Sequence, residues 1–279
     1  MPGERRGAEE GGIYMVDILV RKASLLERLF PGVAEGSTLV PDEVVNPSGI
    51  SDEERREISL GEMSVSQKIA VAVALRNLGY RVPTAATVAE IIRGTPADRS
   101  LEKGDVILRA KTRRVDGPDD LFRIMDGHEP GQPVSLLVRR DGKMRDLDVA
   151  TEPSDDDPDR AVMGFIVGLE IDPPVDVEID AGNIGGPSAG LAFALDIVDE
   201  LERDLDRGRR IAVTGALALD GSVIPIGGVE QKAIGARQAD ADVFLVPDRN
   251  AEEARRHADG LDVVAVETFA EALAALEEA

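Results

Sequence analysis

The segment Gly185-Gly186-Pro187-Ser188-Ala189-Gly190 is the most informative stretch of this 279-residue chain. Proline suits the first turn of a helix, so we expect a helix from Pro187 to about Asp204 with Ser188 in that turn. Unpaired N–H groups and the positive end of the helix dipole would stabilise an oxyanion there, and Gly185 and Gly186 would admit a substrate backbone. A plain helix entry or an anion site has the same pattern, so three interpretations stay open.

A second glycine-rich loop supplies a candidate base for the serine. It runs from Ile224 through Gly227-Gly228 into Lys232, which lies 44 residues after Ser188. Small apolar neighbours such as Ala233 can desolvate an ammonium and lower its pKa. Only about one ordinary lysine in 2,500 is neutral at pH 7, so general-base work needs a depression of roughly three units. The alternative is a solvated lysine on a helix surface.

Histidine offers another partner for the serine. The pattern Gly186-x-Ser188-x-Gly190 fits the nucleophile elbow of α/β-hydrolases, which requires an acid and a histidine further along the chain. His257 is the one downstream histidine, and its basic and polar neighbours indicate an exposed helix end. An esterase using Ser188 and His257 is therefore an alternative function.

Composition excludes several classes of protein. The chain has 54 acidic and 32 basic residues and a net charge of −22, which disfavours nucleic acid as a partner. It has no cysteine, hence no disulfide, thiolate zinc site or cysteine nucleophile, and its two histidines leave no multi-histidine metal centre. We expect no cofactor and no metal. No apolar run approaches the ~20 residues of a membrane span, and residues 1–10 are polar.

Periodicity and turn residues divide the chain into four parts. We expect an N-terminal extension at 1–79, a β-rich unit at 80–151, a charged linker at 152–160 and an α/β domain at 161–279. The extension is predicted to contain a strand at Ile13–Val20, a helix at Ser24–Phe30, a polar linker at Pro41–Glu57 and a helix at Ser64–Leu78. The β-rich unit should hold a strand at 87–92, a turn and strand within 101–107, a helix at 118–125 and a strand at 134–139. A hairpin turn at Asp141-Gly142 should lead into a last strand that ends near 149. The α/β domain is predicted to have strands at 162–169, 175–179, 211–217, 243–246 and 261–266, and helices at 187–204, 229–239, 250–257 and 270–276.

The two glycine-rich loops together resemble the proteolytic domain of Lon proteases, with Thr214-Gly215 and Asp220-Gly221 in order between them. The resemblance covers 162–276 and implies Ser188 as nucleophile, Lys232 as base and Thr214 holding the amine, with Gly186 in support. It also implies protein or peptide substrates and assembly into a homo-oligomeric ring. The sequence has no Gly-x-x-x-x-Gly-Lys-Ser/Thr phosphate loop, so we expect ATP-independent cleavage of unfolded segments. The acid that often precedes the serine in Lon is missing, and we assign no acidic third member.

The β-rich unit resembles a bacterial PDZ domain through Gly94-Thr95-Pro96-Ala97 and the run from Leu101 to Ile107. Such domains add a peptide as an extra strand beside a helix. The resemblance implies a carboxylate loop at 79–82, starting with Gly79 and Tyr80, and a groove helix at 119–125 lined by Phe122 and Met125. Ordinary core packing is the alternative for Phe122 and Met125.

The order of the two domains resembles the bacterial PDZ-Lon proteases. The N-terminal segment agrees through Gly12-Ile13-Tyr14, Met63-x-x-Ser66-Gln67 and the run 72–80. Members of that family usually begin with a membrane anchor and act outside the cytoplasm, whereas this sequence shows none and reads as soluble. Three accounts stay open: truncation, a start at an internal methionine, or a departure from the family. We favour truncation, which implies an extracytoplasmic, membrane-associated protein. The sequence thus predicts an ATP-independent serine endopeptidase with a Ser/Lys dyad. A non-catalytic PDZ scaffold is the alternative besides the esterase.

Overall fold

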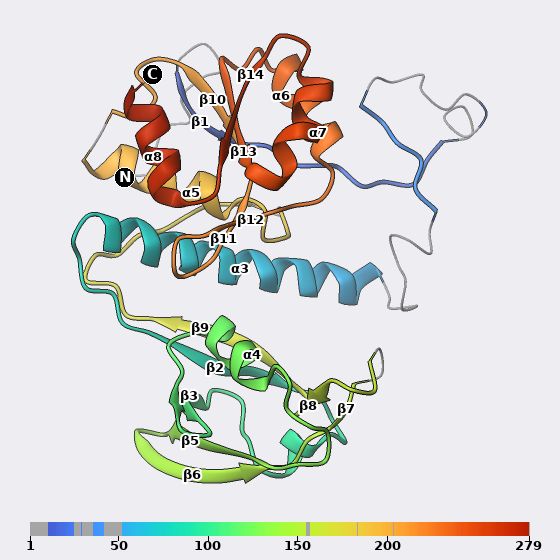
Figure 1. Ribbon diagram of the computed structural model, residues 1–279, viewed down its shortest axis with the longest axis vertical. Coiled ribbons are helices and arrows are strands. Elements are labelled where there is room, and N and C mark those ends of the chain that lie inside the picture. Colours follow the sequence, from blue (N-terminus) through green and yellow to red (C-terminus); the bar gives the residue numbers. More distant parts are fainter. Residues whose placement is uncertain are drawn as a thin grey trace. The chain divides into compact units, whose positions relative to one another are not determined.

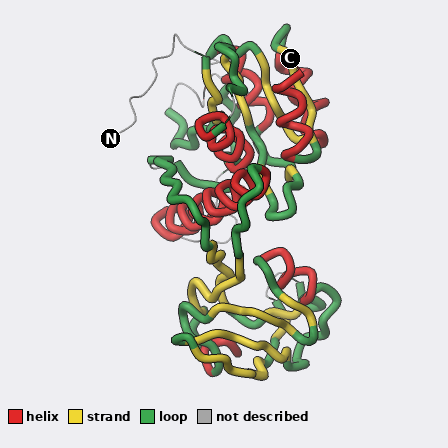
Figure 2. Tube along the Cα trace, turned by 90° about the vertical axis from the view of Figure 1, so that its left-hand side faces the viewer, coloured by secondary structure: helices red, strands yellow, loops and turns green. Residues whose placement is uncertain are grey.

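The computed structural model describes residues 11–24, 29, 36–41, 52–154, 157–182, 184–202 and 204–278. The chain forms two compact units, which are considered separately below: unit 1 comprises residues 1–78 and 177–279, and unit 2 comprises residues 79–176. In Figure 2, unit 1 is rich in helices and unit 2 consists mainly of strands. The predicted fold class, a β-rich unit and an α/β domain, is confirmed.

Unit 1 is built on a parallel sheet of four strands in the order β1-β10-β13-β14. The strands are β1 (Gly12–Met15), β10 (Arg210–Val213), β13 (Val243–Pro247) and β14 (Asp262–Val266). All five residues of β13 are buried, which is the pattern of a strand covered on both faces. The first strand of the sheet therefore comes from the N-terminal segment and lies at its edge beside β10.

Helices cover both faces of this sheet (Figure 1), with α6 and α7 on one side and α5 and α8 on the other. The helices of unit 1 are α3 (Asp52–Asn77), α5 (Gly190–Leu201), α6 (Val229–Gln238), α7 (Asp248–Ala258) and α8 (Phe269–Glu278). The short hairpin of β11 (Ala216–Leu217) and β12 (Val223–Ile224) follows β10. Side chains of α6 and α7 form one core with Phe244 and Val246, alternate residues of β13.

The helix α3 packs along α5 and is longer than predicted. It begins at Asp52, inside the stretch 41–57 that was expected to be a linker. The expectation that no apolar run approaches a membrane span needs correction here, because residues 55–77 are long and apolar enough, by length and composition alone, to cross a membrane. Residues 70–75 are buried against the rest of unit 1, as in the core helix of a water-soluble domain, which can have the same length and composition.

Unit 2 contains an antiparallel sheet in the order β6-β5-β3-β2-β9, with β4 paired to β3. Its strands are β2 (Thr84–Ile91), β3 (Val106–Ala110), β4 (Arg113–Arg114), β5 (Val134–Arg140), β6 (Lys143–Val149) and β9 (Phe165–Ile171). The helix α4 (Pro118–Met125) packs against β2 and β9, and a 3-10 turn, η1 (Pro96–Arg99), follows β2. The predicted helix at 118–125 is confirmed, and so is the hairpin between β5 and β6.

The strand expected at 162–169 was assigned to the wrong unit. It forms β9, which pairs antiparallel with β2 over the whole of that strand and so belongs to unit 2. The stretch 152–160 is also less of a linker than predicted, because β7 (Glu152–Pro153) pairs with β8 (Ala161–Val162). The predicted boundaries at 151 and 161 therefore differ from the division at 176.

Other differences are smaller. Residues 175–179, expected to be a strand, form no strand, and the strand expected at 13–20 ends at Met15. The strand expected at 211–217 is interrupted at Thr214 and Gly215, between β10 and β11. The helix expected at Ser24–Phe30 lies mostly outside the described residues.

Candidate active site

Three side chains from separate elements of unit 1 meet at one point. The Lys232 Nζ lies 2.7 Å from the Ser188 Oγ and 2.9 Å from the Thr214 Oγ1. Lys232 is 3% exposed and Thr214 is fully buried, whereas Ser188 is partly exposed. The amine is therefore enclosed by protein, whereas the serine residue beside it is partly exposed to solvent.

Ser188 stands in a turn two residues before α5. The helix predicted at 187–204 is therefore shorter than expected, because it begins at Gly190 and ends at Leu201. The Gly190 N–H donates to the Pro187 carbonyl across this turn, over 3.4 Å. The Ser188 carbonyl accepts the Gly215 N–H at 2.9 Å, and the Leu191 N–H donates to the Gly215 carbonyl at 3.1 Å. The turn is thus fastened to the segment that follows β10, next to Thr214.

Gly186 shapes the approach to the serine. Its φ of +91° lies in the left-handed region that side chains rarely adopt, and its N–H donates to the Ser59 carbonyl of α3 at 2.9 Å. The predicted supporting role of Gly186 is consistent with this backbone geometry, and remains a prediction as far as catalysis is concerned.

Lys232 is the fourth residue of α6, which begins after Gly228. Gly228 has a φ of +69°, and a Cβ on it would lie against the Ile18 side chain. The Lys232 N–H donates to the Gly228 carbonyl at 3.1 Å, which places the lysine in the first turn of the helix. The positive end of the helix dipole is unfavourable for an ammonium at this position.

Burial lowers the pKa of Lys232 from 10.5 to about 8, and the negative charge of Asp17 opposes this by raising it. With a pKa of about 8, roughly one lysine in ten is neutral at pH 7. Burial thus supplies most of the depression that general-base work requires.

Asp17 reaches this neighbourhood along the edge of the sheet. The Val16 N–H donates to the Val213 carbonyl at 3.2 Å and so extends the pairing of β1 with β10 by one step. Asp17 follows directly, beside the chain that carries Thr214. The side chain of Asp17 is exposed, and its charge acts on the amine through space.

Thr214 is placed by strand pairing and connects the other two groups. Its N–H donates to the Leu245 carbonyl of β13 at 3.0 Å. Its hydroxyl accepts from the Lys232 amine and donates to the Ser188 carbonyl over 3.4 Å. One hydroxyl therefore contacts both candidate catalytic residues.

The remaining predicted site residues lie elsewhere. His257 is in the last turn of α7, and none of the described hydrogen bonds joins it to Ser188.

The predicted peptide-binding residues lie in unit 2. Phe122 of α4 is 59% exposed, and Met125 packs on the core of unit 2. Gly79 and Tyr80 precede β2, which is paired on both sides by β3 and β9, so β2 itself offers no open edge. Among the described strands, the edge strand next to α4 is β9, and the predicted loop at 79–82 stays a prediction.

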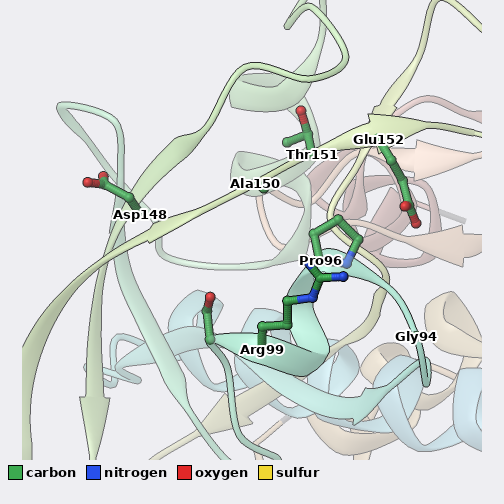
Figure 3. A pocket seen from close by; sticks show the side chains of 8 residues that line it. Gly94, Pro96, Arg99, Asp148, Ala150, Thr151 and Glu152 are labelled. Atoms are coloured by element: carbon green, nitrogen blue, oxygen red, sulfur yellow. The ribbon is translucent and has the colours of Figure 1, made fainter.

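A hollow in unit 2 contains none of the predicted site residues (Figure 3). It has a volume of about 240 Å³ and lies between the η1 turn and the end of β6. Its charged lining residues are Arg99, Asp148 and Glu152, and the Asp148 side chain points away from the others. Nothing in this lining points to a particular ligand.

Three acids, Asp199, Asp204 and Asp206, lie near one another after α5, with oxygens within 4.8 Å. The Asp199 Oδ1 accepts the Leu205 N–H at 2.6 Å, and the Asp204 Oδ1 accepts the Arg207 N–H at 3.2 Å. These bonds shape the turn between α5 and β10, which accounts for the position of the acids without an ion.

The geometry agrees with comparisons against known families. The family described as "Lon protease (S16) C-terminal proteolytic domain" matches residues 173–277. The PDZ domain family matches residues 59–151. The chain therefore carries a PDZ domain followed by a Lon-type proteolytic domain, a class that implies serine peptidase chemistry. Both resemblances drawn from the sequence are confirmed at this level.

The chain is similar to several curated Lon proteases. It is 38% identical to Lon protease 2 of Bacillus subtilis over 90 residues, which are 32% of this chain and 16% of that protein. It is 40% identical to Lon protease of Helicobacter pylori over 98 residues, covering 32% of this chain and 11% of that protein. Among solved structures, the PDZ domain of the SdrC-like protein from Listeria monocytogenes matches with a TM-score of 0.28 and 14% identity, covering 30% of this chain and 86% of that one. The chain thus spans a small part of the Lon proteases it matches, and the predicted ring and membrane association stay predictions.

Sequence reasoning missed the residues of α3 that hold the serine turn. The Ser66 Oγ donates to the Pro187 carbonyl at 3.1 Å, and the Gln67 Nε2 donates to the Ile179 carbonyl at 3.2 Å. The one available signal was the motif Met63-x-x-Ser66-Gln67, which indicated the family and not the contact.

We expect the buried amine to weaken unit 1. Lys232→Met removes the buried charge at nearly constant volume, so it should raise the free energy of unfolding of unit 1 by up to about 3 kcal/mol at pH 6. The folded-state pKa is lower than the unfolded one, so the gain is full below pH 8, shrinks as the pH rises further and vanishes above 10.5. Denaturant unfolding at several pH values measures it.

Lys22→Met is the control, because Lys22 is exposed. It should change the unfolding free energy by less than about 0.5 kcal/mol. A Lys232→Met gain that persists unchanged above pH 10.5 would contradict the explanation by charge burial.

Proposed function

We propose that this chain is an ATP-independent serine endopeptidase in which Ser188 is the nucleophile and Lys232 the general base. The observation that carries the proposal is the 2.7 Å contact between the Ser188 hydroxyl and an amine whose pKa burial has lowered to about 8. A neutral amine has one lone pair and two hydrogens. One hydrogen is donated to Thr214, which leaves the lone pair to accept the proton of Ser188.

In the first step, the Ser188 Oγ attacks the carbonyl carbon of the scissile bond while its proton passes to the Lys232 Nζ. The tetrahedral intermediate collapses when the ammonium returns this proton to the leaving amine, which gives an acyl-enzyme and a free peptide amine. Water then attacks the acyl carbonyl with the neutral amine as base, and the serine hydroxyl is restored.

Two backbone groups are suited to stabilise the oxyanion of this intermediate. The N–H groups of Ser188 and Ala189 lie in the turn before α5, and neither donates to an acceptor in the described part of the chain. Donors fixed in this way stabilise developing negative charge without reorganisation at the moment of reaction.

Substrates are proposed to be unfolded protein segments recruited by unit 2. The strand β9 ends the sheet order, and α4 packs beside it. A peptide added to β9 would gain main-chain hydrogen bonds, and exposed apolar side chains such as Phe122 on α4 and Ile166 on β9 would contact alternate side chains.

The nucleophile and base are tested by removal. Ser188→Ala and Lys232→Ala should each lower kcat/KM for unfolded casein by at least about 10⁴-fold, because each removes a group that reacts directly. His257→Ala should keep wild-type activity. The reverse pattern, loss with His257→Ala and survival with Lys232→Ala, would establish the esterase-type arrangement. A wild-type protein that cleaves no unfolded substrate while still binding peptides would favour a scaffold.

The pH dependence tests the charge state of the base. Because only the neutral amine accepts a proton, kcat/KM should rise with pH and level off above about 8. Asp17→Asn removes the negative charge that raises the pKa of Lys232, so the rising limb should move to lower pH. Glu230→Gln is a control of equal charge change on α6 and should leave the limb in place, since Glu230 is not among the groups that shift this pKa. A limb at the same pH in all three proteins would exclude Lys232 as the group that titrates.

Recruitment along β9 is tested by a matched pair of exposed side chains. Phe122→Ala should raise KM for casein about fivefold, as expected when an apolar contact is lost, and leave kcat for a short peptide unchanged. Met144→Ala is the control, because Met144 is 61% exposed on β6, at the opposite edge of the same sheet. A rise in KM for Met144→Ala without one for Phe122→Ala would contradict this proposal, because it would place the bound peptide at the β6 edge.

A further inference from the structure

The helix α3 holds the segment before and around the nucleophile at three points. The Ser59 carbonyl accepts the Gly186 N–H at 2.9 Å, the Ser66 hydroxyl donates to the Pro187 carbonyl at 3.1 Å, and the Gln67 amide donates to the Ile179 carbonyl at 3.2 Å. Two of these three bonds come from side chains of α3, and both side chains donate to backbone carbonyls. Substituting those side chains therefore tests the contact without changing the loop itself.

Ser66 is built closely into this contact. It is 4% exposed, and a buried hydroxyl needs a partner. A Cβ at position 190 would lie 2.9 Å from the Ser66 Oγ, which is closer than such contacts normally allow. Gly190 thus leaves the space through which Ser66 reaches the Pro187 carbonyl.

The bond acts on the peptide group that contains the nucleophile's own N–H. The Pro187 carbonyl and the Ser188 N–H belong to one planar trans peptide, so they point in opposite directions. A donor that fixes the carbonyl also fixes the direction of the N–H. That N–H is one of the two proposed oxyanion donors, and it carries no hydrogen bond of its own among the described residues.

We propose that Ser66 and Gln67 are positioning residues for the peptidase reaction: Ser66 orients the Pro187–Ser188 peptide so that its N–H faces the oxyanion, and Gln67 anchors the chain that leads to this turn. This inference rests on the proposed function. It assigns a role to the Ser66-Gln67 pair of the sequence motif, which neither the nucleophile nor the base explains.

The test compares Ser66→Ala with Ser64→Ala in the full chain. Ser66→Ala should lower kcat about 10- to 100-fold and leave KM within about twofold of wild type. This loss is smaller than that expected when an oxyanion donor is removed, because the Ser188 N–H is still present and only less well oriented. The rising limb of the pH profile should not move, because the Lys232 surroundings are unchanged. Ser64 is exposed on the same helix, so Ser64→Ala should match wild type in kcat. Equal kcat in the two variants, or a shifted limb in Ser66→Ala, would overturn the inference.

Hydrogen exchange of the amides in residues 184–191 gives a readout that does not need catalysis. Ser66→Ala should speed this exchange relative to Ser64→Ala, and Gln67→Glu, which keeps the shape but replaces the donor amide by a carboxylate, should do the same. Unchanged exchange in both variants would overturn the positioning role even if kcat falls. If the variants exchange faster but the wild-type protein cleaves no substrate, the contact between α3 and the serine turn is supported and only the proposed peptidase function is rejected.

Discussion

The contact on which the proposed chemistry depends joins a buried amine to the hydroxyl of a partly exposed serine, 2.7 Å away. Enclosing that amine lowers its pKa to about 8, and the same enclosure costs the fold about 3 kcal/mol, the equivalent of this pKa depression. The parallel sheet and the helices on both its faces supply the burial that offsets this cost. They also bring together side chains that lie far apart in the sequence.

Each of the three groups is held by backbone more than by other side chains. Thr214 is fixed by its N–H on β13, Ser188 by its carbonyl on Gly215, and Lys232 by the first turn of α6. A site built on strand ends and helix starts varies little in geometry, because the surrounding ladder of hydrogen bonds must break before it moves. The Thr214 hydroxyl then needs to make only two contacts to align the amine with the serine.

The sequence was sufficient for the pairing of Ser188 with Lys232 and Thr214, because two glycine-rich loops with fixed spacing carry that signal. It was sufficient for α4 and for the β5–β6 hairpin, whose turn residues are local. It failed for β9, since a run such as Phe165–Ile171 indicates a strand but not its partner, and here the partner is β2. It also failed for the start of α3, where Asp52 to Glu57 are polar and resemble a linker. Ser66 and Gln67 bind backbone carbonyls, which leave no trace in the sequence pattern.

The placement of β1 and α3 makes the PDZ unit an insertion within the proteolytic unit, since residues before 79 and after 176 fold together. The region matched by the Lon description, 173–277, lacks both elements. A fragment cut at residue 173 would leave the edge of β10 unpaired and the α5 surface that faces α3 uncovered, which are features that promote aggregation. A minimal recombinant peptidase is better obtained by deleting the inserted unit and joining residue 78 to residue 177 through a short linker.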